Sequence, residues 1–141
     1  MQRALAIGTL TAAILVLFWS SLSGQDEPAG EVRALMREKL DHAQKILEGT
    51  TSEVYDLVLK HAAELRRLTG EKEWKVLPTV EYNQLSMEFL RSVESLETAA
   101  KAKEQDAVDL AYLNLTMKCM YCHKYVRTTR EARSGFGKLL R

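Results

Sequence analysis

Residues 105–126 decide the fold expected for this chain, and they read QDAVDLAYLNLTMKCMYCHKYV. When successive residues are placed 100° apart around a helix axis, the apolar positions of this segment fall on one stripe. That stripe comprises Val108, Ala111, Tyr112, Leu115, Cys119, Cys122 and Val126. The pattern predicts an amphipathic helix from near Gln105 through Tyr125 or further, with Gly135 and Gly137 marking a loose end.

Three more amphipathic helices are predicted upstream. They cover about residues 31–48, 50–68 and 79–103. Gly49 is typical of a residue that ends a helix, and Thr50–Ser52 with Glu53 is typical of a helix start. Proline is absent from all of these stretches. The linker before the third helix includes Trp74 and Pro78.

Each upstream helix also carries one apolar stripe. In the first helix the expected stripe is Val32, Met36, Leu40, Ala43 and Leu47. In the second helix His61 falls near the centre of the stripe, and in the third Tyr82 and Phe89 face inward. Four such helices joined by short loops predict an all-α fold, an antiparallel four-helix bundle whose sites are built between facing helices.

The first 24 residues are typical of a secretory signal. Arg3 supplies the positive charge, Ala4–Trp19 is largely apolar, and Ser21–Gly24 offers small residues for cleavage. The apolar stretch is shorter than the ~20 residues that a membrane-spanning helix needs. We therefore expect a signal peptide at 1–24, a folded domain at 25–141 and a periplasmic location. The alternative is an uncleaved anchor through residues 4–19.

Composition narrows the function. The chain has 141 residues, 46% of them hydrophobic, and a net charge of +1, which is typical of one ordinary globular domain. Its 20 basic residues are matched by 19 acidic ones, which argues against nucleic-acid binding. The segment from Lys118 to the end is basic, with Glu131 as its one acidic residue. Such a tail is either solvated or faces an anionic partner or cofactor.

Both cysteines lie in one pentapeptide, Cys119-Met120-Tyr121-Cys122-His123. Cys-x-x-Cys-His is the attachment motif of c-type haem. Two thiols one helical turn apart can each add across a haem vinyl group to form a thioether, and the adjacent histidine then serves as the proximal iron ligand. The motif predicts one covalently bound haem c.

The motif has three other interpretations. A thiol redox pair would need a thioredoxin-like βαβ context, which the helical pattern does not offer. A zinc site would need a fourth ligand, and His42 and His61 lie on other predicted helices. A disulfide between Cys119 and Cys122 is plausible in an exported protein but gives no reason for His123.

A motif near the C-terminal end of four helices, behind an export signal, resembles the class II c-type cytochromes, the cytochrome c-prime family. Arg127, four residues after His123, matches a basic residue usual in that family and is a candidate contact for a haem propionate. Val126 stands where the family has an aromatic residue. Residues 35–49 and 122–127 also look like short exported cytochromes c of planctomycete-type bacteria.

The resemblance implies that the first helix supplies the residue over the distal haem face. A methionine there gives a six-coordinate iron suited to electron transfer, whereas a non-ligating residue leaves an iron that binds nitric oxide or similar gases. Met36 lies on the apolar stripe of the first helix. Without the resemblance, Met36 would be taken as an ordinary core methionine. Helical-wheel positions place Met87, Met117 and Met120 off their stripes.

His61 is the alternative sixth ligand, because an inward histidine without a partner is costly. A hydrogen bond inside the bundle would explain it equally well. We expect a non-enzymatic monohaem cytochrome that exchanges electrons with redox partner proteins and, like many of the relatives that it resembles, can form a homodimer. The alternatives are a five-coordinate gas-binding haem protein and an exported helical module with one disulfide.

Overall fold

The chain is helical throughout the part that the structure, a computed structural model, describes: the backbone of residues 27–139 and the side chains of 29–132. The elements are α2 (Glu27–Thr51), α3 (Tyr55–Leu68), the short 3-10 helix η1 (Lys72–Trp74), α4 (Val80–Ala102) and α5 (Gln105–Leu139). The predicted all-α class is confirmed, since this part contains no strand.

The predicted signal at 1–24 lies outside the described residues. Within them, no helix combines the length and the apolar character that crossing a membrane requires. The contacts reported below all lie within the unit Val32–Arg141.

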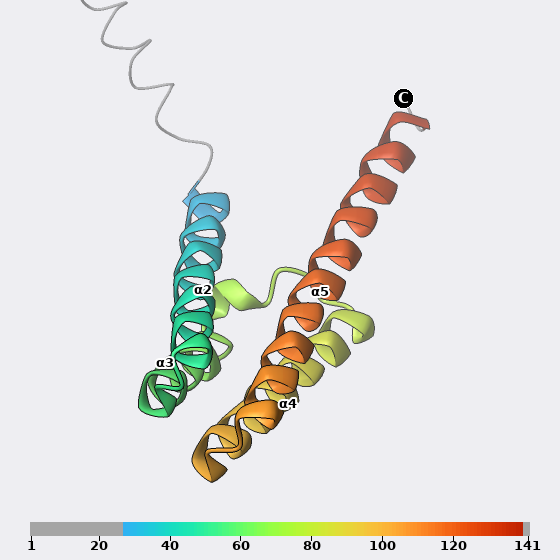
Figure 1. Ribbon diagram of the computed structural model, residues 1–141. Coiled ribbons are helices and arrows are strands. Elements are labelled where there is room, and N and C mark those ends of the chain that lie inside the picture. Colours follow the sequence, from blue (N-terminus) through green and yellow to red (C-terminus); the bar gives the residue numbers. More distant parts are fainter. Residues whose placement is uncertain (1–26, 140–141) are drawn as a thin grey trace, which may run out of the picture. The chain divides into compact units, whose positions relative to one another are not determined.

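Helix α4 packs along α5, and α3 packs against α4 (Figure 1). Two polar contacts join α4 to α5: Lys118 Nζ lies 3.1 Å from a Glu88 carboxylate oxygen, and the Tyr125 hydroxyl donates to Thr79 Oγ1 at 2.9 Å. Thr79 also caps α4, because its hydroxyl oxygen accepts from the Tyr82 backbone N–H. The start of α4 is therefore fixed to α5.

The core forms where the predicted stripes of the last three helices meet. Its most deeply buried large side chains are Tyr82, Phe89, Leu65, Leu68, Leu96, Leu115, Val58, Val93 and Val108, joined by Ile46 from α2. Trp74 of η1 is also buried, and its indole N–H donates to Ser86 Oγ at 2.9 Å. This hydrogen bond ties the linker to α4 and helps to hold the Trp74 ring in the core.

The apolar stripe predicted for the first helix is wrong in part. Leu40 and Leu47 are 57% and 44% exposed, whereas Leu35 and Ile46 are the large apolar residues of α2 that are buried. The helix has two adjoining apolar faces, and the predicted stripe follows only the face that carries Met36, Leu40 and Ala43. Leu35 and Ile46 belong to the core, while the other face borders the cavity described below.

The turn between α2 and α3 also differs from its prediction. Helix α2 continues through Gly49 to Thr51, and the Thr51 hydroxyl donates back to the carbonyl of Leu47 at 2.9 Å. That hydroxyl therefore serves the end of α2 rather than the start of α3. The chain reverses at Glu53, whose φ is +55°, and α3 begins after Val54 without a side-chain cap.

Gly49 is buried and is needed for close packing rather than for helix termination. A Cβ at this position would lie 2.9 Å from Val58 Cγ2 and 3.1 Å from both Val54 O and Val58 N. We expect Gly49→Ala to lower the free energy of unfolding by about 1–3 kcal/mol, as overpacking usually does. Urea unfolding monitored by circular dichroism measures this change.

Gly30→Ala is the matched control, because nothing lies within 4 Å of its added Cβ and Gly30 also lies within α2. Helix propensity alone should make that variant more stable by about 0.5–1 kcal/mol. Equal effects of the two substitutions would contradict the steric role of Gly49.

Candidate functional site

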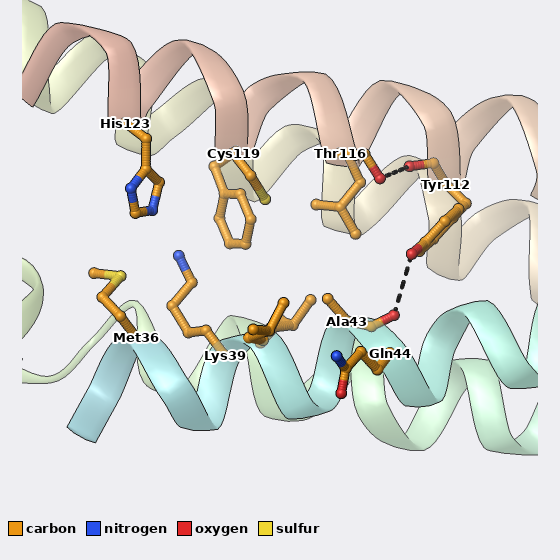
Figure 2. Close-up of a pocket in the computed structure, with 12 residues that line it drawn as sticks. Met36, Lys39, Ala43, Gln44, Tyr112, Thr116, Cys119 and His123 are labelled. Atoms are coloured by element: carbon orange, nitrogen blue, oxygen red, sulfur yellow. Dashed lines mark hydrogen bonds between the residues drawn. The ribbon is translucent and has the colours of Figure 1, made fainter. Parts of the chain in front are cut away.

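A cavity of about 200 Å³ lies between α2 and α5 (Figure 2). Its walls are mostly apolar. They are formed by Met36, Lys39, Leu40, Ala43 and Gln44 of α2, Leu65 of α3, Phe89 of α4, and Tyr112, Leu115, Thr116, Cys119 and His123 of α5. At one end, the Tyr112 hydroxyl donates to the Ala43 carbonyl across the cavity at 3.4 Å. The predicted haem motif therefore borders this cavity through Cys119 and His123.

The two cysteines are free thiols on one side of α5. Both are half-buried and pack against the core. Burial raises the pKa of Cys119 and of Cys122, and the nearby Lys39 ammonium opposes this rise. At neutral pH both are protonated thiols. Their spacing of three residues puts both sulfurs over the same stretch of the helix, as thioether formation with one porphyrin requires.

His123 lies at the edge of the cavity, where its ring is aimed toward α2 (Figure 2). Partial burial of the ring lowers the pKa of His123, and the Lys39 and Arg127 cations lower it further. The imidazole is therefore neutral at pH 7, which is the form that coordinates a metal. Arg127 lines an open groove together with His123 on the outer side of α5.

Met36 faces His123 from the opposite wall (Figure 2). It is half-buried and packs against the core. Met87, Met117 and Met120 are 53%, 41% and 57% exposed, in agreement with their predicted positions off the stripes. The fold thus brings a thioether and an imidazole to opposite sides of one cavity.

Lys39 was not singled out in the sequence, although it interrupts an apolar face of α2 one turn after Met36. Its Nζ lies 3.7 Å from the centroid of the Trp74 ring and 4.3 Å from that of Phe89. Burial lowers the pKa of Lys39 to about 8, and the two cysteines oppose this shift. The residues that line the cavity include no carboxylate.

The chemical types of the side chains that line the cavity suit a haem better than the volume of the cavity does. The lining includes the Cys119 thiol, the His123 imidazole and the Met36 thioether, which are side-chain types that hold haem c. Phe89 and Tyr112 supply aromatic walls. The volume is below the ~300–1,000 Å³ usual for sites that enclose drug-sized ligands. Cys119 and His123 also border the open groove on α5 that contains Arg127, which has a volume of about 550 Å³, so the cavity is only part of the space beside these residues.

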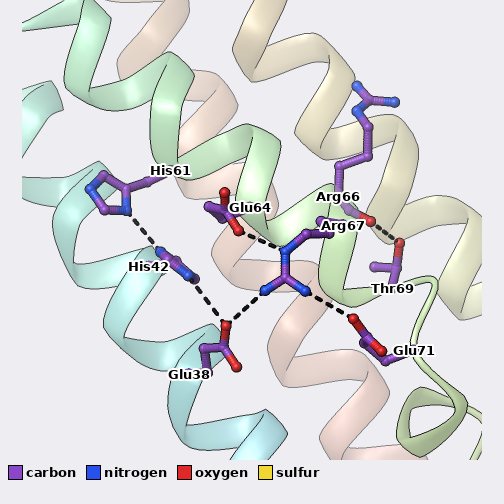
Figure 3. A network of polar contacts seen from close by, with 8 residues as sticks. All are labelled: Glu38, His42, His61, Glu64, Arg66, Arg67, Thr69 and Glu71. Carbon is purple, nitrogen blue, oxygen red and sulfur yellow. Dashed lines mark hydrogen bonds and ion pairs between the residues drawn. The ribbon is translucent and has the colours of Figure 1, made fainter.

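His61, the alternative ligand, lies away from this cavity. Its Nδ1 is 2.8 Å from Nδ1 of His42, and the two rings are 5.1 Å apart (Figure 3). His42 Nε2 lies 3.9 Å from a Glu38 carboxylate oxygen, and Arg67 contacts Glu38 at 2.9 Å. The hydrogen bond between α2 and α3 supplies the partner that the inward histidine needed.

This histidine pair predicts a loss of stability in acid. Burial lowers the pKa of His61, and His42, Lys60 and Lys45 add to the effect while Glu64 opposes it. Because the folded pKa is below the unfolded value of 6.5, the unfolded state takes up the proton first as the pH falls. The contribution to stability is complete above about pH 6.5 and decreases toward the folded pKa.

Urea unfolding at several pH values between about 8 and 5 tests this expectation. The His61→Gln variant should lose less stability on acidification than the wild-type chain. Taking the difference between the two proteins removes the contribution of His123, whose pKa is also lowered. Parallel pH profiles for both proteins would show that the histidine pair does not act in this way.

Comparison of the chain with protein-family models, curated proteins and solved structures finds no match. Among the described residues, no three histidine, cysteine, aspartate or glutamate side chains form a group that could hold a metal ion. Of the aromatic residues on the predicted inward stripes, Phe89 and Tyr112 line the cavity. Tyr82 is buried elsewhere in the core, where its hydroxyl donates to the Trp74 carbonyl.

Proposed function

We propose that this chain is a periplasmic monohaem c-type cytochrome that carries electrons. Residues 25–141 form an antiparallel four-helix bundle that binds one haem c through Cys119 and Cys122, with His123 as the proximal ligand. The arrangement of α3, α4 and α5 is compatible with such a bundle. The resemblance to class II c-type cytochromes supports the same assignment.

One observation carries the proposal. Met36 on α2 and His123 on α5 face each other across a cavity that Cys119 also lines. These residues are far apart in the sequence, which predicts both of them as iron ligands. A disulfide module would give no reason for a neutral imidazole and a thioether to face one another.

Each proposed ligand has a defined task. The Cys119 and Cys122 sulfurs would hold the haem through thioether bonds, each formed by adding S–H across a vinyl group so that no atom is lost. His123 offers a neutral ring nitrogen, and Met36 offers a thioether that favours a high reduction potential. When bound, haem c supplies a site for one-electron transfer.

The remaining residues set the surroundings of that site. Leu40, Phe89 and Leu115 limit the access of water and thereby influence the potential. Arg127 stands one helical turn beyond His123 and is suited to pair with a propionate. Export through residues 1–24 would deliver the chain to the compartment where haem c is attached and where its redox partners are found.

The test is to produce the full chain together with a bacterial c-type cytochrome maturation system. We expect a purified protein with a covalent haem, a reversible one-electron couple and a low-spin ferric spectrum. A high-spin ferric protein that binds nitric oxide at once would favour the gas-binding alternative. A purified chain with a Cys119–Cys122 disulfide and no haem would contradict the proposal.

A further inference from the structure

The cavity contains a third potential ligand, Lys39, for which the proposed function has no role. Its side chain extends from α2 toward α5 and ends near the level of His123 and Cys119 (Figure 2). Met36 and Lys39 are three residues apart, so they lie on the same face of α2. Any iron that Met36 can reach from this face is therefore also within the range of the longer lysine side chain.

The surroundings of Lys39 do not explain it as an ordinary charged residue. Its ammonium contacts the rings of Trp74 and Phe89 rather than a carboxylate, and no acidic residue lines the cavity. The exposed lysine of the same helix, Lys45, instead pairs with Glu48 at 2.6 Å. An amine enclosed by apolar and aromatic walls is biased toward its neutral form, which has a lone pair to donate.

We propose that Lys39 is a second ligand for the sixth coordination position and binds the iron whenever Met36 leaves it. In this exchange the iron–sulfur bond to Met36 breaks, the ammonium releases one proton to solvent, and the nitrogen lone pair forms the new bond. No electron is transferred in the exchange. This inference rests on the proposed function, because it requires a haem at Cys119 and Cys122.

The consequence is that the sixth coordination position of the iron does not stay vacant. Loss of the Met36 thioether alone would not create a five-coordinate iron, because an amine on the same helix face would take its place. The pair Met36 and Lys39 thus favours electron transfer over binding of small gases. Lys39 has two other conceivable roles, as a cation for a haem propionate or as a packing residue, and both are outcomes of the experiment below.

The experiment compares four full-length haem-loaded proteins at neutral pH: wild type, Met36→Ala, Met36→Ala/Lys39→Arg and Met36→Ala/Lys45→Arg. The ferric spin state is measured by electron paramagnetic resonance and by absorption. We expect Met36→Ala to remain low-spin with a nitrogen ligand, and Met36→Ala/Lys39→Arg to become largely high-spin. Arginine keeps the positive charge but is not an iron ligand, since its guanidinium stays protonated.

The Lys45 control should remain low-spin, because Lys45 is exposed and does not line the cavity. A high-spin Met36→Ala protein would overturn the proposal, as would a low-spin Met36→Ala/Lys39→Arg protein. The latter result would indicate another donor, such as His61. A Lys39→Gln version of the double variant tests the same point where arginine prevents folding, and it should also be high-spin.

Failure of the proposed function is distinguishable from failure of this inference. If none of the proteins carries covalent haem, the proposed function and the role of Lys39 are both contradicted. If all carry covalent haem but Met36→Ala is already high-spin, only the role of Lys39 is lost. Far-ultraviolet circular dichroism of each protein verifies that the helices are retained.

Discussion

Replacing both Cys119 and Cys122 with serine is expected to abolish covalent haem attachment in the full chain. Serine keeps the size and helix position of each cysteine but cannot form a thioether. Both thiols are half-buried against the core, Cys119 lines the cavity, and the sequence contains no third cysteine that could substitute for them. Haem staining after denaturing electrophoresis measures the effect, and we expect complete loss of the signal.

Met120→Ser is the matched control for this prediction. Met120 lies inside the motif, but its side chain is 57% exposed and off the apolar stripe. It should retain the full haem signal. Covalent haem in the Cys119→Ser/Cys122→Ser protein would contradict the assignment of the motif, as would loss of haem from the control.

Met36→Ala is expected to remove the weak far-red absorption band that a methionine thioether gives with ferric iron. It should also lower the midpoint potential by on the order of 0.1 V, against the ~0.8 V range that axial ligands span. The physical reason is that a thioether stabilises ferrous iron relative to a nitrogen or oxygen ligand. Absorption spectra and a redox titration of the haem-loaded protein measure the two effects.

Met87→Ala provides the comparison, since Met87 is 53% exposed on α4 and does not line the cavity. It should leave the band and the potential unchanged. If Met36→Ala keeps the methionine band, then Met36 is an ordinary core residue and the sixth ligand lies elsewhere.

The helical class and three of the four apolar stripes were predictable because helical periodicity is a local signal. Val58, Phe89 and Leu115 are buried where their stripes place them. The burial of α2 was not predictable to the same degree, because the choice between its two apolar faces depends on contacts with distant helices. Gly49 illustrates the same limit: its sequence context suggests a helix end, whereas the close approach of Val58 is a tertiary feature.

In the candidate site too, some residues could be predicted from the sequence and others could not. The motif Cys119–His123 is contiguous and could be recognised in the sequence, while its partner across the cavity depended on a resemblance. His61 looked like a ligand on the wheel, yet its ring is paired with His42 on the adjacent helix. Lys39 is recognisable in the sequence as a charged residue within an apolar face. Its enclosure by the Trp74 and Phe89 rings could not be predicted, because it depends on the packing of distant elements.

The central claim is a covalent haem at Cys119 and Cys122, and mass spectrometry of the peptide that contains residues 119–123 tests it most directly. The peptide should come from the full chain produced with a c-type maturation system. We expect its mass to exceed that of the free dithiol peptide by one haem, with both cysteines resistant to thiol-alkylating reagents. A mass equal to that of the free dithiol or of its disulfide would contradict the claim.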